Sequence, residues 1–278
     1  MPTPDDYPDF TLHVFTSMAD IKRATSFDWR SRFKAAVIHL GSSLAVGVVV
    51  AAVVFALWYP GAYRSLSGGT ELFMLVVGVD LALGPLITLV IFDRRKPFKE
   101  LRRDIAVVIA MQLAALGYGL NMVSISRPVV LALEENRFRV VPASGVYVEE
   151  LSSAAEGFRS LSLTGPRLLR SALPTDPIEK TKALSLGFRG YDIGTRPLLW
   201  LPWDAAARAE ALAHAKPLAI LAARHPTRKA DFDAAVAKTG LDAGGLVYIP
   251  MITFREDWVA LLDAAKGDVV GYAPLDGF

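Results

Sequence analysis

Three long apolar runs dominate the first 125 residues of the chain. Ala35–Tyr59 and Ile105–Ile125 contain no Asp, Glu, Lys or Arg, and Leu72–Phe92 contains one charged residue, Asp80. A helix needs about 20 apolar residues to cross the hydrocarbon core of a bilayer, and it satisfies its own backbone hydrogen bonds there. Three buried helices of a soluble protein would instead show a polar stripe at helical spacing, which these runs lack. The pattern therefore predicts three transmembrane helices.

The second half of the chain has the composition of a soluble domain. Its predicted strands are Val129–Leu133, Arg137–Val141, Pro166–Leu173, Leu246–Ile252, Trp258–Leu262 and Asp268–Ala273. Its predicted helices are Ser152–Phe158, Asp176–Leu186, Asp204–Ala215 and Lys229–Thr239. Leu218–Ala222 is either a continuation of the third of these helices or a short strand, and Pro217 favours a break. This order favours an α+β domain with a mainly antiparallel sheet.

We therefore expect three parts. Residues 1–30 form a disordered cytoplasmic tail, residues 31–127 a three-helix transmembrane domain, and residues 128–278 an exported α+β domain. Within the tail, the acidic start lacks cations, so that either Met1 or Met18 is the true initiator. The first apolar run is too long for the core of a cleavable signal peptide, and we interpret it as an uncleaved signal anchor.

The positions of the cations predict the orientation of the spans. Cations cluster before the first run, at Lys22, Arg23, Arg30, Arg32 and Lys34, and between the second and third runs, at Arg94, Arg95, Lys96, Lys99, Arg102 and Arg103. The loop at 60–71 contains only Arg64. Because loops rich in Lys and Arg stay in the cytoplasm, the domain after the third run is expected on the opposite side of the membrane, which is compatible with a periplasmic domain. Trp58 and Tyr59 would then lie at the outer interface.

Composition and motifs offer little chemistry. A net charge of +2 does not suggest a nucleic-acid partner, and the absence of Cys excludes disulfides. The four histidines form no zinc motif, and no nucleophile elbow or nucleotide-binding loop occurs. Adjacent acids such as Glu134-Glu135 and Glu149-Glu150 are expected in solvated turns. We therefore expect a protein that is not an enzyme, with no catalytic residue, cofactor or metal site.

Asp80 is the polar residue of greatest interest. A carboxylate in a span costs about 2.5 to 3.5 kcal/mol on insertion scales and usually faces a partner or a water path. A lone carboxylate cannot serve as both general acid and general base, which disfavours an intramembrane aspartyl peptidase. Counting residues from the membrane edges places Asp80 level with Tyr118, and His39 level with Thr88. We expect an Asp80–Tyr118 hydrogen bond and a bond from His39 to Thr88 or water, with Gln112 as a further packing group.

Gly84 and Pro85 interrupt the second run shortly after Asp80. Proline removes a backbone donor, and glycine lets another helix approach closely. One interpretation is an internal kink packed against the other two spans. The alternative is a groove, formed by Asp80, Gly84 and Thr88, for the single transmembrane helix of a partner.

Several motifs resemble one known family, the type IV pilin accessory proteins of the TfpX/TfpZ group. The motifs are Trp58-Tyr59-Pro60-Gly61, Gly78-Val79-Asp80-Leu81-Ala82-Leu83-Gly84-Pro85-Leu86-Ile87-Thr88-Leu89, Gln112-Leu113-Ala114-Ala115-Leu116-Gly117-Tyr118-Gly119, Arg137-Phe138-Arg139-Val140-Val141 and Asp268-Val269-Val270-Gly271-Tyr272-Ala273-Pro274-Leu275. The resemblance implies an inner-membrane accessory protein or chaperone that supports pilin stability, surface display or pilus assembly.

The partners implied are type IV pilin, other pilus assembly proteins and the lipid bilayer. Two alternatives stay open. One is a membrane-anchored envelope sensor or scaffold whose exported domain binds another protein. The other is a membrane enzyme with an unrecognised site.

Overall fold

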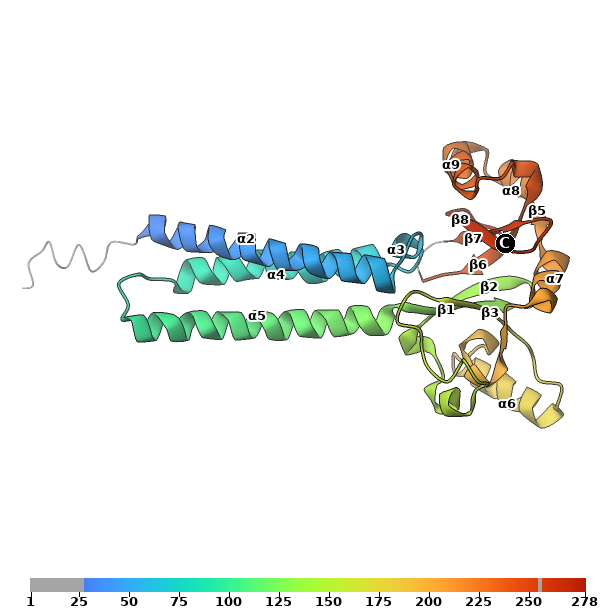
Figure 1. Cartoon of the computed structure of the whole chain (residues 1–278), viewed down its shortest axis with the longest axis horizontal. Helices are drawn as coiled ribbons and strands as arrows, with labels where there is room; N and C mark the ends of the chain where they lie inside the picture. Colours follow the sequence, from blue (N-terminus) through green and yellow to red (C-terminus); the bar gives the residue numbers. More distant parts are fainter. Residues whose placement is uncertain (1–27, 255–256) are drawn as a thin grey trace, which may run out of the picture.

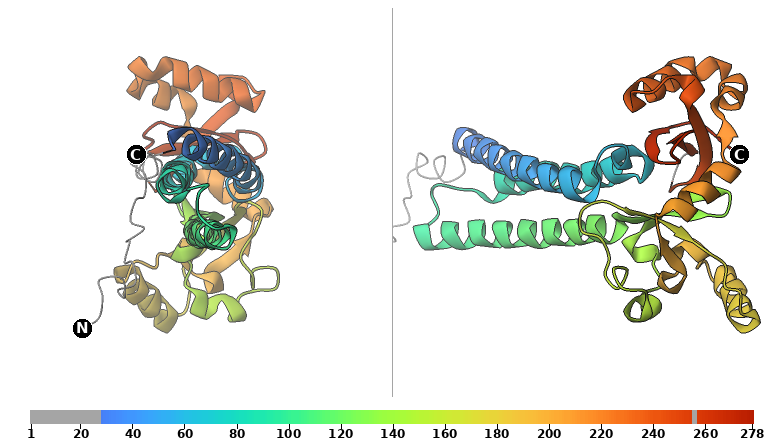
Figure 2. Two further views of the ribbon diagram at one scale, coloured as in Figure 1. Left: turned by 90° about the vertical axis from the view of Figure 1, so that its left-hand side faces the viewer. Right: turned by 45° about the vertical axis from the view of Figure 1, so that its right-hand side comes forward.

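A computed structural model describes residues 28–254 and 257–278 of the chain. The predictions for the first 27 residues, including the disordered tail and the choice of initiator, lie outside the described residues. A long helical bundle carries an α+β domain at one end (Figure 1). The three bundle helices lie at the corners of a triangle when viewed along the bundle (Figure 2).

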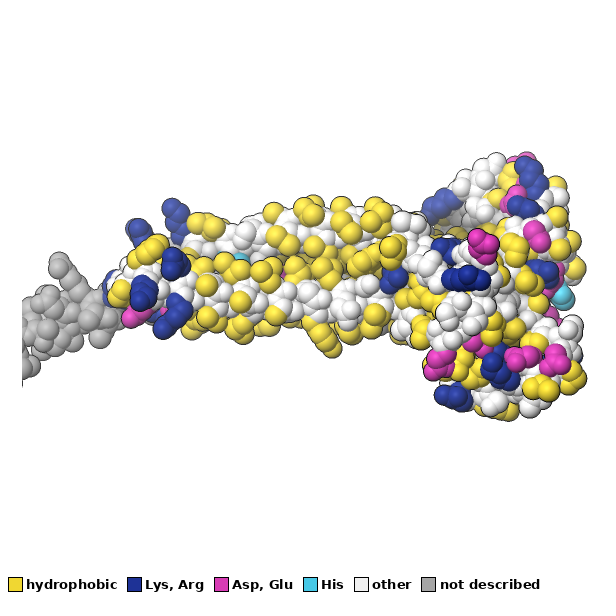
Figure 3. Space-filling view, turned by 60° about the horizontal axis from the view of Figure 1, so that its bottom comes forward, with side chains coloured by type: hydrophobic (Ala, Val, Ile, Leu, Met, Phe, Trp, Pro, Cys, Tyr) yellow, Lys and Arg dark blue, Asp and Glu magenta, His cyan; other side chains and the backbone are white. Residues whose placement is uncertain are grey.

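The bundle consists of the three helices expected from the apolar runs. The first, α2 (Trp29–Val53), continues into a π-helical turn (Val54–Trp58). The second is α4 (Gly69–Ile91), and the third is α5 (Phe98–Ser126). By length and composition, all three are suited to crossing a membrane. Apolar side chains cover the outside of the bundle, and Lys and Arg gather at the end far from the domain (Figure 3).

Close packing within the bundle depends on glycines. A Cβ added at Gly119 of α5 would lie 2.3 Å from Val76, and one at Gly47 of α2 would lie 3.3 Å from Val77. Such small residues let the backbones of neighbouring helices approach closely. Helix α4 therefore contacts both α2 and α5 along its length.

The domain is built on one mixed sheet with strand order β4-β3-β1-β2-β6-β7-β8, and β5 pairs with β6. The strands are β1 (Pro128–Glu134), β2 (Arg137–Pro142), β3 (Arg167–Ser171), β4 (Trp200–Pro202), β5 (Lys216–Pro217), β6 (Leu246–Ile252), β7 (Trp258–Asp263) and β8 (Val269–Ala273). The β1–β3 and β2–β6 pairs are parallel, and the others are antiparallel. The prediction of an α+β domain is confirmed. Most strand pairs are antiparallel, as predicted, but the two parallel pairs make the sheet a mixed one.

Helices cover both faces of the sheet. They are α6 (Pro177–Phe188), α7 (Ala205–His214), α8 (Leu218–Arg224) and α9 (Lys229–Thr239). On one face, Leu218 of α8 and Ala235 of α9 pack against Tyr248 of β6. On the other face, Ala211 of α7 packs in the cluster that contains Ile249 of β6. The alternation of Tyr248 and Ile249 follows from the two-residue period of a strand.

Two local predictions were wrong or incomplete. The predicted helix Ser152–Phe158 is absent, and a 3₁₀ segment at Val148–Ser153 precedes irregular chain there. Leu218–Ala222 neither continues α7 nor forms a strand, because Lys216 and Pro217 pair with β6 before a new helix, α8, begins. By contrast, Lys229–Thr239 is the predicted helix, and Gly240 ends it with φ 70°.

The junction between bundle and domain is packed, and it includes a short helix that the sequence did not suggest. This helix, α3 (Tyr63–Leu66), lies in the loop between the first two apolar runs, and its residues belong to the domain core. The hydroxyls of Tyr63 and Tyr272 share a hydrogen bond of 2.7 Å. Burial raises the pKa of Tyr63 well above its usual value. The bundle therefore docks on the sheet through side chains rather than through a flexible linker.

Tyr59, which was expected with Trp58 at the outer interface, is buried at the domain end of the bundle. Its side chain has an exposed fraction of 0%, and its hydroxyl donates to the carbonyl oxygen of Val123 at 3.0 Å. A Cβ at Gly69 would lie 2.4 Å from the Tyr59 ring. Tyr59 therefore joins the ends of all three bundle helices instead of facing lipid headgroups.

Candidate functional site

A chain of hydrogen bonds crosses the apolar bundle and joins all three helices. His39 of α2 contacts Thr88 of α4 through Nδ1, at 2.5 Å from Oγ1. The other ring nitrogen, Nε2, contacts Oε1 of Gln112 on α5. The Gln112 amide Nε2 in turn donates to Oδ1 of Asp80 on α4, at 3.2 Å. His39 and Thr88 thus form the pair that the sequence analysis expected.

The direction of the hydrogen bonds follows from the amide of Gln112. Its nitrogen donates to Asp80, so its oxygen accepts, and His39 must carry a proton on Nε2. In a neutral ring, Nδ1 then accepts from the Thr88 hydroxyl, and in a cationic ring it donates to the same oxygen. Each of the four side chains in this network has a hydrogen-bond partner, which reduces the cost of placing it among apolar helices.

Gly84 makes room for this network. A Cβ at Gly84 would lie 2.1 Å from Nε2 of Gln112 and 3.2 Å from Nε2 of His39. The absence of a side chain on α4 therefore lets the amide of α5 and the ring of α2 meet above it. Pro85 follows inside α4 without ending the helix, which continues to Ile91.

The expected Asp80–Tyr118 pair is wrong. Tyr118 has an exposed fraction of 69% and points away from the network, whereas Asp80 binds Gln112. The error comes from the start of α5. The basic residues after Pro97 were counted as a loop, but α5 begins at Phe98, so that an earlier residue lies level with Asp80.

The contacts of Gly84 distinguish between the two interpretations of the second span, an internally packed kink and a groove for a partner helix. Its face of α4 is filled by Gln112 and His39 of the same chain. At Gly84, the second span is therefore packed internally against the other two helices and leaves no room for a partner helix. A partner helix would have to dock on another face of the bundle, where apolar side chains such as Leu83 and Leu86 are exposed.

The network offers limited chemistry. It contains one carboxylate and one imidazole, joined through an amide that holds both in place. Within residues 28–254 and 257–278, no three His, Asp or Glu side chains come together as a metal site would require. The arrangement is suited to holding three helices in register.

The end of the bundle far from the domain is strongly basic and partly neutralised. Arg32 of α2 donates to the carbonyl oxygen of Leu89 at 3.2 Å and pairs with Asp93 at 3.2 Å. Lys96 pairs with Asp104 at 2.6 Å. Hydrogen bonds from the backbone and side chain of Arg95 lower the pKa of Asp93 to about 2. These contacts fix the turn between α4 and α5.

Two buried acids of the domain form ion pairs where solvated turns were expected. Glu134 has an exposed fraction of 3%, and it accepts from Arg137 at 3.1 Å and from Arg139 at 2.7 Å. Glu150 has an exposed fraction of 4%, and it pairs at 2.6 Å with Arg196, whose exposed fraction is 0%. The assignment to solvated turns was therefore wrong for Glu134 and Glu150, whereas their neighbours Glu135 and Glu149 are exposed. Glu134 is the last residue of strand β1, which is buried throughout. The uninterrupted apolar residues before it were a sign in the sequence that Glu134 could be buried too.

Comparison with known proteins places the chain in a family. A family model described as "Fimbrial assembly protein FimB" matches residues 27–68 of this chain. A fimbrial assembly protein of Dichelobacter nodosus, serogroup I, is 30% identical over 228 residues, which cover 81% of this chain and 88% of that protein. The serogroup E1 protein of the same organism is 29% identical over the same shares. No solved structure matches the chain. The chain belongs to the fimbrial assembly protein family.

Proposed function

We propose that this protein is a non-enzymatic accessory protein of the inner membrane that supports type IV pilin during pilus assembly, in the manner of the TfpX/TfpZ group. The observation that carries the proposal is the match to fimbrial assembly proteins over 81% of the chain. A match of this length includes residues of both the bundle and the domain. A helper of this form can contact a membrane-held subunit both within the bilayer and outside it.

Charge placement supports the orientation. Nine cations of the described chain gather at the bundle end away from the domain: Arg30, Arg32, Lys34, Arg94, Arg95, Lys96, Lys99, Arg102 and Arg103. Arg64 is the one Lys or Arg in the loop at the domain end. Because basic ends stay cytoplasmic, the domain lies in the periplasm.

Photocrosslinking in living cells tests the choice of partner. A photoreactive residue replaces Leu83, which is 52% exposed on the bundle, or Leu163, which is 67% exposed on the domain. Phe73 of the same helix, which is 5% exposed, serves as a buried site where no crosslink is expected. Crosslinks to pilin support the accessory role. Crosslinks only to other envelope proteins would favour a sensor or scaffold.

The variant Asp80→Asn separates an accessory protein from an enzyme. The oxygen of asparagine still accepts the hydrogen bond from Gln112, while the ionisable carboxyl is lost. We expect cells with this variant to assemble pili at the wild-type level, measured by electron microscopy and by sheared surface pilin. Loss of pili, with normal amounts of the variant in the membrane, would favour an acid–base role for Asp80.

A further inference from the structure

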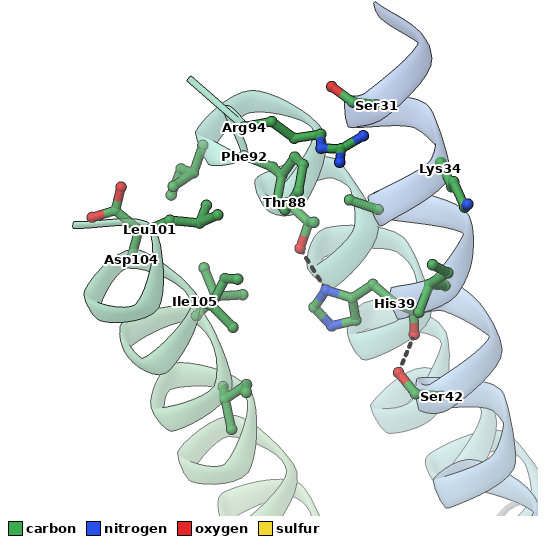
Figure 4. A pocket seen from close by; sticks show the side chains of 15 residues that line it. Ser31, Lys34, His39, Ser42, Thr88, Phe92, Arg94, Leu101, Asp104 and Ile105 are labelled. Carbon is green, nitrogen blue, oxygen red and sulfur yellow. Dashed lines mark hydrogen bonds between the residues drawn. The ribbon is translucent and has the colours of Figure 1, made fainter. Parts of the chain in front are cut away.

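A cavity opens between the three bundle helices near their basic end. Its volume is about 470 Å³, and α2, α4 and α5 all contribute to its lining. Figure 4 shows Lys34 and Arg94 at one end of this cavity, and His39 with Thr88 deeper along the helices. Ile105 and Val108 of α5 give it an apolar wall. The cavity therefore has a charged mouth and a hydrophobic interior.

The cations at the mouth are not held in ion pairs within the described part of the chain, and the nearby carboxylate of Asp28 accepts from Ser31 while Arg94 helps to lower its pKa. Arg32 and Lys96 are engaged by Asp93 and Asp104. Among the residues that the structure describes, neither Lys34 nor Arg94 forms an ion pair, and both are exposed. The carboxylate that lines the cavity, Asp104, is held by Lys96 at 2.6 Å. The net charge available at the mouth is therefore positive.

The length of the cavity fits one leaflet of a bilayer. Along α2 its lining extends from Ser31 to Ser42, which corresponds to about 16 Å at 1.5 Å per residue. Half of a hydrocarbon core of about 30 Å is roughly 15 Å. An acyl chain that enters beside Lys34 would follow this lining for about 12 Å before it passes Ser42.

We infer that this cavity binds an anionic phospholipid of the bilayer, with its phosphate on Lys34 and Arg94 and an acyl chain among the apolar side chains. Basic pockets between transmembrane helices on the cytoplasmic side are suited to anionic headgroups. The bound lipid fills the space between α2 and α5 from the basic end as far as His39 and Thr88, where the polar network begins. The inference rests on the membrane placement in the proposed function.

Native mass spectrometry of the full-length protein in detergent tests this site. Phosphatidylglycerol and phosphatidylcholine with the same acyl chains are titrated against delipidated protein. We expect at least tenfold tighter retention of phosphatidylglycerol. The double variant Lys34→Gln/Arg94→Gln should weaken that retention roughly 10- to 30-fold, the effect of two cations near an anionic surface.

The double variant Lys99→Gln/Arg102→Gln is the matched control. It removes the same charge from the same end, but neither residue lines the cavity, so retention should change less than threefold. A third variant, Ala35→Phe, fills the apolar part and should weaken binding of long-chain but not of short-chain phosphatidylglycerol. Circular dichroism and gel filtration establish that each variant is folded.

Three results would overturn the inference. They are equal retention of the two lipids, an equal loss in the control double variant, and unchanged long-chain binding in Ala35→Phe. None of these results involves pilin, so they leave the accessory role to be tested by crosslinking.

Discussion

The variant Gly84→Ala probes the network that joins the three helices. The added methyl group would lie 2.1 Å from Nε2 of Gln112. The amide is the end of a flexible side chain, so the collision itself is relieved when the amide moves. The movement breaks the hydrogen bonds of Gln112 to Asp80 and His39, and that loss is the main cost.

The magnitude follows from hydrogen bonds between membrane helices. Each averages about 0.6 kcal/mol and reaches at most about 1.7, so two of them contribute roughly 1 to 3 kcal/mol. The variant Gly78→Ala in the same helix is the control, since a Cβ there meets nothing within 4 Å. Both substitutions gain the same helix propensity, which therefore cancels in the comparison.

The assay is unfolding of the purified protein in mixed micelles, followed by tryptophan fluorescence. We expect Gly84→Ala to unfold with a free energy lower by about 1 to 3 kcal/mol than Gly78→Ala. In a Gln112→Ala background, the same substitution should cost much less, because no amide remains to be displaced. Equal stability of Gly84→Ala and Gly78→Ala would refute the reasoning.

Two further predictions concern the domain and its junction with the bundle. Glu150→Ala leaves the buried guanidinium of Arg196 without its closest partner and should lower the free energy of unfolding by about 3 to 5 kcal/mol, whereas the exposed neighbour Glu149 tolerates the same change. Burial and the contact with Tyr272 raise the pKa of Tyr63 in the folded state. Above pH about 10 the unfolded state releases the Tyr63 proton while the folded state keeps it. The free energy of unfolding is therefore unaffected by this group below pH about 10 and decreases as the pH rises further. Thermal melts between pH 9 and 11 should show this decrease, and it should be smaller in Tyr63→Phe; an unchanged slope would contradict it.

The sequence predicted the bundle and most of the sheet because both depend on local patterns. A run without charges is visible residue by residue, and so is the hairpin whose Gly267 adopts φ 71°. The parallel pairs of β1 with β3 and of β2 with β6 join distant segments, and no local pattern specifies them. The ion pair between Glu150 and Arg196 is similarly long-range.

The polar network was predicted in part for the same reason. His39 and Thr88 lie near helix ends that the apolar runs define well, so counting residues brought them together. The partner of Asp80 depends on where α5 begins. The charged residues after Pro97 are helical, and charge alone does not distinguish a helix end from a loop. Gln112 was therefore recognised as polar but not as the link between Asp80 and His39.

Single-cysteine labelling tests most directly whether the basic end and the domain lie on opposite sides of the membrane. The chain contains no Cys, so Lys266→Cys in the domain and Lys99→Cys at the basic end each introduce one thiol. In intact spheroplasts, a membrane-impermeant maleimide should label the first variant and should label the second only after permeabilisation. Labelling of Lys99→Cys in intact spheroplasts, with Lys266→Cys protected, would contradict the account.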